Sequence, residues 1–266
     1  MSYKTVISDL DGTLLKSDHT ISTLAKSVFT LLSEMNVNLI LASGRPYQDV
    51  KSVCDILGIK ASTITSNGAM IHDQDGNIVF QSHLPDDLVK TLLNDDVDSD
   101  VHVNVYTDNE WLVSKENPEL EKYHLLTGFQ YRVCDLHSEK INNVCKIFYY
   151  GNPEKLKIIE DKLRIHDNEL SITFSNENSL EIMNHGISKG DSLKQAHNAI
   201  NADLNNTIAF GDGQNDYEIL SYVKKGFIMK NASDKLKKLL PDTEVVGCND
   251  DDSVANKLIS LYSLNL

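Results

Sequence analysis

The sequence predicts an α/β protein in which a second, α+β domain interrupts a parallel β-sheet domain. Short β-favouring runs alternate with helix-spaced apolar residues at the start of the chain, and the same alternation returns after residue 188. Between these segments the order changes to hairpin-like pairs of strands with a few helices. Strands that alternate with helices indicate a parallel sheet with right-handed crossovers. We therefore expect a discontinuous domain over residues 1–82 and 188–266, and an inserted domain over residues 83–187, here called the insert.

The first segment begins with three expected strands, which are Thr5–Ser8, Asn38–Ala42 and Ser62–Thr65. Apolar residues recur at helical spacing over residues 21–35, between the first two strands. A second helix is expected over Tyr47–Leu57, because Gly58 is the kind of residue that ends a helix. The Asp-Gly pair at residues 75–76 lies between two short β-favouring runs and predicts a hairpin.

The insert and the last segment predict further elements of both kinds. In the insert we expect strands over residues 101–105, 111–113, 146–150, 170–174 and 179–183. The pair Asn152-Pro153 predicts the start of a helix that runs to about residue 165. In the last segment we expect helices over residues 189–198, 215–223, 233–239 and 253–261, and strands over residues 207–210, 226–229 and 244–246.

Composition excludes several classes of protein. The 266 residues are 41% hydrophobic and carry a net charge of −14, so the acidic surface disfavours nucleic acid as a partner. No run approaches the roughly 18 apolar residues that a membrane span needs, so no membrane partner is expected. The first residues reach acids at Asp9 and Asp11 and do not resemble a signal or transit peptide. We therefore expect a cytoplasmic protein, as a monomer or a weak homo-oligomer.

The cysteines and histidines do not form a recognisable metal motif. The four cysteines include no CxxC pair, so we expect buried free thiols rather than a zinc site or a disulfide framework. The nine histidines show no HxxxH or HExxH spacing. The sequence therefore does not predict a histidine metal site.

An acidic motif follows the first expected strand. Residues 9–13 (DLDGT) place two carboxylates at the carboxyl end of a strand, where open parallel sheets bind their ligands. Carboxylate and carbonyl oxygens are the ligands that Mg²⁺ prefers. The same letters also form ordinary turns, and residues 73–76 (DQDG) are expected to be one within the hairpin. The motif taken alone is therefore compatible with either interpretation.

Three more motifs lie at comparable places in the chain. Residues 42–45 (ASGR) end the second strand, where a hydroxyl and an amide can bind a phosphate oxygen. Residues 188–190 (SKG) place a lysine at a helix start, where the helix dipole disfavours a cation. Residues 211–216 (GDGQND) form another acidic cluster between a strand and a helix. Taken singly, these motifs also fit a plain loop, a surface lysine and a helix cap.

The ordered set of four motifs resembles the haloacid dehalogenase (HAD) superfamily of phosphohydrolases. The insert lies between the second and third motifs, which is similar to the Cof-like subfamily IIB with a type II cap. Residues 67–69 (NGA) and 180–182 (LEI) also match this pattern. The resemblance implies a Rossmann-like core that carries the chemistry and an α+β cap that covers it.

The resemblance also implies a role for each matching residue. Asp9 would be the nucleophile that forms an aspartyl-phosphate. Asp11 would protonate the leaving alcohol and then activate water, which requires a raised pKa. The Mg²⁺ ligands would be Asp9, the Asp11 carbonyl and Asp212. The phosphate oxygens would be bound by Leu10, Ser43, Gly44, Lys189 and Asn215, with Asp216 orienting Lys189 or the metal ligands.

Three functions remain open at this point. The first is a Mg²⁺-dependent phosphatase of small phosphorylated metabolites, with sugar phosphates favoured and flavin mononucleotide and pyridoxal phosphate as alternatives. The second is a phosphomutase, and the third is a non-catalytic phosphometabolite-binding or regulatory protein. The sequence assigns no role to Arg45, Asn67 or Glu181, and His185 is expected at the surface, with a substrate contact as the alternative.

Overall fold

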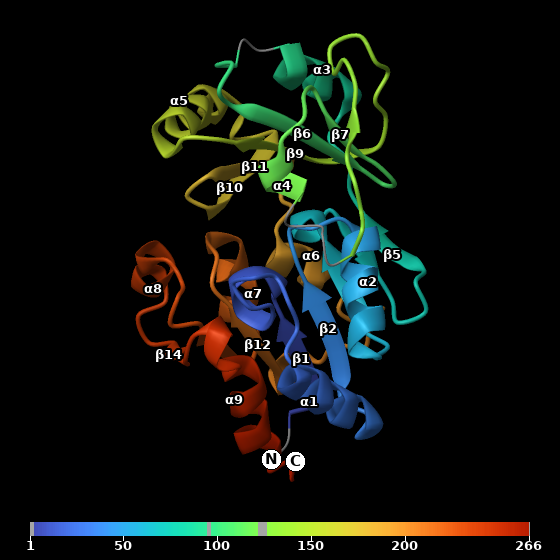
Figure 1. Cartoon of the computed structure of the whole chain (residues 1–266), viewed down its shortest axis with the longest axis vertical. Coiled ribbons are helices and arrows are strands. Elements are labelled where there is room, and N and C mark those ends of the chain that lie inside the picture. The colour runs from blue at the N-terminus through green and yellow to red at the C-terminus, as the bar shows by residue number, and fades with distance from the viewer. Residues whose placement is uncertain (1–2, 95–96, 122–126, 266) are drawn as a thin grey trace.

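The computed structural model describes residues 3–94, 97–121 and 127–265, which form two units stacked along the long axis of the molecule (Figure 1). The first unit contains an eight-stranded sheet with the strand order β14-β13-β12-β1-β2-β3-β4-β5. The second unit contains a six-stranded sheet with the order β10-β11-β9-β6-β7-β8. The two sheets come from different parts of the chain, because all strands of the second sheet lie between residues 102 and 184.

The first sheet is parallel apart from its hairpin edge. Its parallel strands are β1 (Thr5–Ser8), β2 (Asn38–Ala42), β3 (Ser62–Thr65), β12 (Thr207–Gly211), β13 (Lys225–Ile228) and β14 (Glu244–Val245). The antiparallel edge consists of β4 (Met70–His72) and β5 (Ile78–Gln81). The carboxyl ends of β1, β2, β3 and β12 therefore lie side by side at one edge of this sheet.

Helices bury both faces of the first sheet, because neighbouring apolar residues of each strand point to opposite faces. In β1, Val6 packs with α1 (Thr23–Glu34), α2 (Tyr47–Leu57) and α9 (Ser253–Tyr262). Ile7, one residue later, packs with α6 (Lys189–Ala196), α7 (Tyr217–Tyr222) and α8 (Asp234–Leu239). This burial from both sides fixes where each strand ends, and with it the loops that follow.

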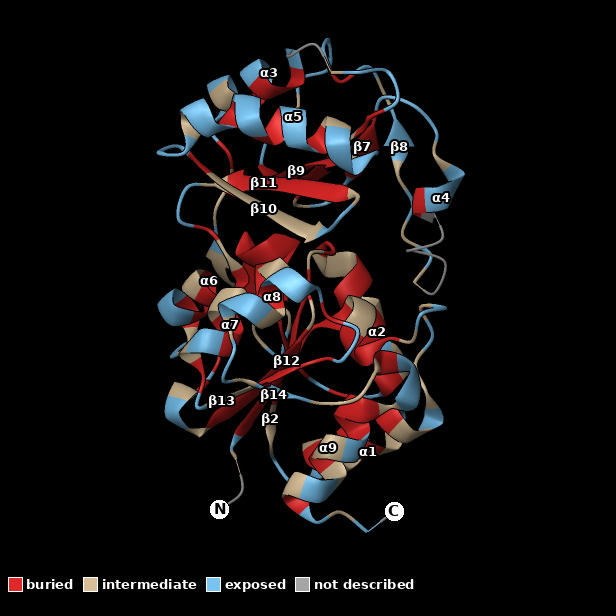
Figure 2. Ribbon diagram, turned by 90° about the vertical axis from the view of Figure 1, so that its left-hand side faces the viewer, coloured by how far each residue is buried: buried red, intermediate tan, exposed pale blue. Residues whose placement is uncertain are grey.

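The second sheet is covered by helices on one face only. Its strands are β6 (His102–Thr107), β7 (Trp111–Val113), β8 (Arg132–Val133), β9 (Val144–Tyr150), β10 (Leu170–Asn176) and β11 (Ser179–Asn184). The helices α3 (Asp86–Asn94) and α5 (Pro153–Leu163) pack on the face that points away from the first unit, and α4 (Pro118–Glu121) is a short helix at the side (Figure 2). The other face of the sheet is turned toward the carboxyl ends of the first sheet.

The expected α/β class is confirmed, and the differences lie mainly at element boundaries. The expected strand 101–105 runs two residues further, to Thr107, and the expected helix 189–198 ends at Ala196. The elements α3, α4 and β8 were not predicted. The expectation of buried free thiols holds for Cys54 and Cys145, whereas Cys134 and Cys248 are only partly buried. Across the described residues, we find no helix that combines the length and the apolar character of a membrane span.

Candidate active site

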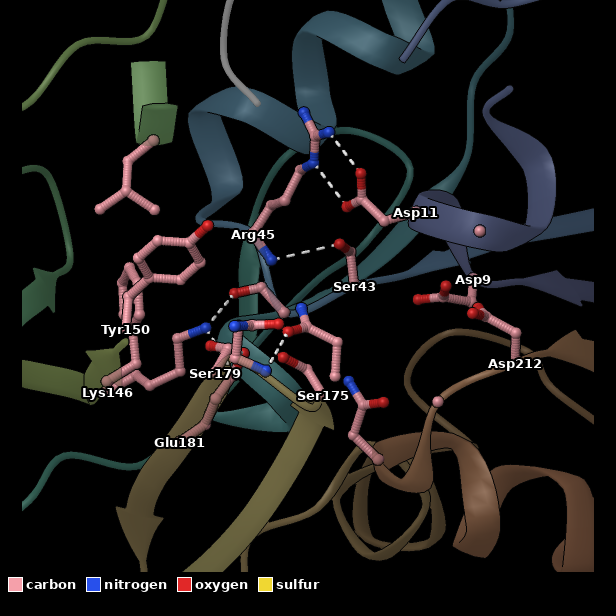
Figure 3. Close-up of a pocket in the computed structure, with 18 of the residues that line it drawn as sticks. Asp9, Asp11, Ser43, Arg45, Lys146, Tyr150, Ser175, Ser179, Glu181 and Asp212 are labelled. Carbon is pink, nitrogen blue, oxygen red and sulfur yellow. Dashed lines mark hydrogen bonds and ion pairs between the residues drawn. The ribbon is translucent and has the colours of Figure 1, made fainter. Parts of the chain in front are cut away.

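A cavity of about 430 Å³ lies between the carboxyl edge of the first sheet and the open face of the second sheet (Figure 3). Its floor contains residues from the loops after β1, β2 and β12, and its roof comes from β6, β9, β11 and the turn that joins β10 to β11. Six of the residues singled out in the sequence line it, namely Asp9, Asp11, Ser43, Gly44, Asp212 and Asn215.

Lys189 lies behind Asp9 and connects two acidic motifs. Its Nζ donates to Asp9 Oδ1 at 2.6 Å and to Asp216 Oδ1 at 2.7 Å, and the lysine is fully buried. Ser188 caps the helix that begins at Lys189, since its side chain accepts from the amide of Asp191. The second oxygen of Asp216 accepts from the amides of Asp212 and Gly213 at 3.0 and 2.9 Å. Asp216 therefore orients both Lys189 and the loop that carries Asp212.

The floor has more negative charge than one lysine can balance. Asp9, Asp212 and Asp216 each offer an oxygen within 4.8 Å of the others. Burial and repulsion from the neighbouring carboxylates raise the pKa of Asp9, and the same causes raise the pKa of Asp212 to about 7. An oxygen-only cluster that resists ionisation in this way fits a hard divalent cation such as Mg²⁺.

Two neighbouring residues hold the Asp212 carboxylate in place. Thr13 donates its hydroxyl to Asp212 Oδ1 at 2.9 Å. Gly12 has a φ of +73°, and a Cβ at this position would overlap the Asp212 carboxylate. The glycine of the DLDGT motif is therefore required both for the turn and for the close approach of the two acidic loops.

Asp11 does not show the raised pKa that the acid role implied by the resemblance requires. Arg45 donates to both carboxylate oxygens, Nε to Oδ2 at 2.8 Å and the terminal nitrogen to Oδ1 at 2.6 Å (Figure 3). The Nδ1 atom of His19 lies 3.3 Å from the same Oδ1. Although burial opposes ionisation, the Arg45 guanidinium holds the pKa of Asp11 well below its usual range. The sequence does not reveal this pairing, because Arg45 lies 34 positions away from Asp11.

The remaining predicted residues lie at different depths. The Ser43 hydroxyl accepts from the backbone amide of Arg45 at 3.1 Å. The side-chain amide of Asn215 donates to Asn67 Oδ1 at 2.9 Å. The Leu10 side chain is buried in the core of the first unit, so only its backbone is available to a ligand. His185 is exposed and does not line the cavity, as expected for a surface histidine.

The roof of the cavity contains a buried ion pair. Lys146 Nζ donates to Glu181 Oε2 at 2.7 Å and to the carbonyl of Gly44 at 2.6 Å. Glu181 also accepts from the side chain of Asn67, so β9 and β11 of the second sheet are connected to two loops of the first. Along β9 the side chains alternate, so that Lys146 and Phe148 face the cavity while the residue between them packs under the helices.

A family model described as haloacid dehalogenase-like hydrolase matches residues 6–258. The chain belongs to the haloacid dehalogenase-like hydrolase family. This match confirms the resemblance that the four ordered motifs indicated.

Relatives within this family bear the names of phosphatases. A Haemophilus influenzae protein named "Putative phosphatase" is 38% identical over 269 residues, which cover 100% of this chain and 99% of the relative. A Klebsiella pneumoniae protein named "HMP-PP phosphatase" is 33% identical and covers 90% of this chain and 88% of its own length. A solved haloacid dehalogenase-like hydrolase from B. subtilis has a TM-score of 0.83 at 25% identity, with 96% of this chain and 98% of that chain covered. The expected enzyme class, a phosphatase, is confirmed.

The sequence did not reveal which residues outside a motif contact its functional side chains. Arg45, Thr13 and Lys146 each contact a motif residue that lies far away in the chain. The only signal was that Arg45 and Thr13 are the last residues of the ASGR and DLDGT motifs. Lys146 and Glu181 give no local signal of pairing, since they lie on two strands that pair only in the folded insert.

Proposed function

We propose that this protein is a Mg²⁺-dependent phosphatase that hydrolyses small phosphorylated metabolites through an aspartyl-phosphate. The observation that carries the proposal is the placement of Asp9 on the cavity floor, between the Lys189 ammonium and the Asp212 carboxylate. A carboxylate can approach a phosphate only where positive charge offsets the repulsion between them. Lys189 supplies part of this charge, and the acidic cluster supplies a site for the rest.

In the proposed reaction, Asp9 attacks phosphorus while the bond to the leaving oxygen breaks. Lys189, Ser43 and the amides of Leu10 and Gly44 bind the phosphate oxygens, and water then attacks the aspartyl-phosphate to regenerate Asp9. Asp9, the Asp11 carbonyl and Asp212 would hold the Mg²⁺, which would supply further positive charge for the reaction.

We assign the two proton transfers to Asp11. While Arg45 contacts both of its carboxylate oxygens, Asp11 stays ionised but is a weak base, because the same contact lowers its affinity for a proton. Donation to the leaving oxygen requires a protonated Asp11. We propose that substrate binding weakens the contact with Arg45 before that step.

The metal requirement is tested by removing and restoring the ion. Chelator should abolish the release of inorganic phosphate, and added Mg²⁺ should restore it, because the acidic floor repels phosphate when no cation is bound. Full activity in excess chelator would exclude the proposed metal role.

The covalent step is tested with Asp9→Asn. This variant should lose several orders of magnitude in turnover and form no trapped aspartyl-phosphate, because the amide is a poor nucleophile. Asp73→Asn is the matched control, since Asp73 occupies the same position in the DQDG turn of the hairpin and does not line the cavity. Equal activity of Asp9→Asn and Asp73→Asn would rule out the mechanism.

For the substrate we propose a small phosphate ester, with sugar phosphates as the first class to test. The roof presents the aromatic residues Tyr106, Phe148 and Tyr150 together with polar residues 175–179 of the β10–β11 hairpin, and both groups can contact a ring-shaped leaving group. Relatives named HMP-PP phosphatase make that compound a second candidate. Screening phosphorylated metabolites for phosphate release tests this proposal, and isomerisation of a hexose phosphate without release would indicate a phosphomutase instead.

We propose that residues 1–82 and 188–266 form the catalytic domain and that the insert is its cap. The placement of the insert above the cavity and the absence of the four motifs from it support this division. We further propose a cytoplasmic location and a monomer or weak homo-oligomer. The free thiols of the described residues support the location, which cell fractionation would test.

A further inference from the structure

A second cluster of ligand-type side chains lies outside the catalytic cavity. His83 Nε2 is 2.7 Å from Asp108 Oδ1, and Cys145 Sγ is 3.4 Å from the same oxygen. All three atoms lie within 4.8 Å of one another. None of the three residues lines the cavity or takes part in the reaction proposed above.

The three residues come from separate elements that meet where the chain enters the insert. His83 follows β5 and precedes α3, Asp108 follows β6, and Cys145 lies in β9. The side chains of His83 and Asp108 are 24% and 21% exposed, whereas Cys145 is buried. The cluster therefore has one side open to solvent and the thiol at its inner end.

We propose that His83, Asp108 and Cys145 bind a transition-metal ion of the Zn²⁺ class, with water as the fourth ligand. One imidazole nitrogen, one carboxylate oxygen and one thiolate are the donors that zinc takes in proteins, and three protein ligands leave one position open. Thiolate disfavours Mg²⁺, which takes oxygen ligands. The chain thus has two separate sites, one of oxygen donors in the cavity and one of mixed donors at the entrance to the insert.

Metal binding replaces a proton at this cluster. In the metal-free protein the Cys145 thiol donates to Asp108 Oδ1 at 3.4 Å, so it carries a proton that a metal ion would displace. When the metal–sulfur bond forms, this proton is released to solvent, and His83 binds as the neutral imidazole. Affinity therefore increases as pH rises.

The ion would connect the entry segment to the second sheet. Next to His83, the amide of Leu84 already donates to the carbonyl of Val144 at 2.8 Å. The carbonyl of Asp108 accepts from Gln48 of α2 at 2.9 Å, so the cluster also touches the first unit. We expect the bound ion to tie the entry segment at His83 to the paired strands β6 and β9.

The experiment titrates the full-length, metal-free protein with Co²⁺, which replaces Zn²⁺ and can be observed by absorption. A thiolate ligand produces a sulfur-to-cobalt charge-transfer band, whereas cobalt at the oxygen-only cavity site produces none. We expect one saturable charge-transfer band, which Zn²⁺ displaces and excess Mg²⁺ does not.

Variants then assign the band to the cluster. Cys145→Ser should abolish it, whereas Cys54→Ser should retain it, because Cys54 is a buried thiol on α2 without these neighbours. His83→Gln retains the thiol and should weaken cobalt binding by more than the roughly 10-fold that loss of an outer-sphere partner costs. Circular dichroism and phosphate release identify variants that have lost the fold. Absence of the band in the wild-type protein, its persistence in Cys145→Ser, or an unchanged titration of His83→Gln would each overturn the proposal.

Discussion

The identity of some residues in this protein depends on contacts with distant parts of the chain. Gly12 is the clearest example. Its left-handed backbone places it directly against the Asp212 carboxylate. Gly58 has nearly the same backbone, with a φ of +71°, but no atom lies within 4 Å of where its Cβ would be.

This pair predicts different outcomes for the same substitution. Gly12→Ala and Gly58→Ala should each lose about 1–2 kcal/mol of unfolding free energy, because alanine disfavours this conformation. Only Gly12→Ala should also lose activity, by about 100-fold, since it displaces Asp212. Chemical denaturation and phosphate release measure the two effects, and equal activity of both variants would contradict the role given to Gly12.

His72 predicts a pH dependence of stability. Burial lowers its pKa to about 4, its ring stacks on Tyr47 at 3.6 Å, and its Nδ1 has no hydrogen-bond partner among the described residues. In the unfolded chain the imidazole of His72 has a pKa of about 6.5. Between about pH 6.5 and 4 the unfolded chain therefore binds more protons than the native state. Stability should therefore fall as pH falls through this window, by at most about 3 kcal/mol.

His72→Phe should remove this loss because phenylalanine can stack but cannot be protonated. The measurement is the unfolding free energy at several pH values between 4 and 7. His185→Phe is the control at an exposed histidine and should leave the slope unchanged. If the His72→Phe slope equals that of the wild-type protein, the histidine is not the group responsible.

At the scale of elements, the buried pair of Lys146 and Glu181 connects β9 and β11 to the loops of the first sheet. Lys146→Met should cost about 3–5 kcal/mol of unfolding free energy, because it leaves a buried carboxylate without its cation. Adding Glu181→Gln should recover part of this loss, since the neutral amide can still accept from Asn67. Urea unfolding of the two variants measures the difference, and a double variant less stable than Lys146→Met alone would refute this account.

At the scale of the whole molecule, we predict that the first unit carries the chemistry and that the insert selects the substrate. The floor residues belong to the first unit, whereas the insert provides the roof of the cavity. We therefore expect that replacing residues 83–187 with the matching segment of the Klebsiella pneumoniae relative changes which phosphate ester is preferred. Dependence on Mg²⁺ should persist, because its ligands lie outside the exchanged segment. Rates on a panel of esters test this, with p-nitrophenyl phosphate as the small reference substrate, and an unchanged ranking would contradict the role of the insert.

The α/β class, the strands of the first sheet and the motifs that end them could be predicted from the order of the residues. Helical and alternating periodicities are local properties, and they depend on residues only a few positions apart. The sequence also predicted that the motifs DLDGT, ASGR and GDGQND lie close together in the fold. Parallel strands have their carboxyl ends at one edge of the sheet. The alternation of strands and helices therefore predicts that the loops after these strands lie side by side.

The contacts between residues that are far apart in the chain could be found only in the folded structure. The ionisation of Asp11 depends on Arg45, the position of Asp212 depends on Thr13, and the buried charge of Glu181 depends on Lys146. The cluster of His83, Asp108 and Cys145 was missed for the same reason, since its ligands come from three elements. A charge interacts with whatever lies within a few ångströms of it, and in these cases the partner comes from a distant part of the chain. No local pattern encodes such a distance, so only the folded structure reveals these pairings.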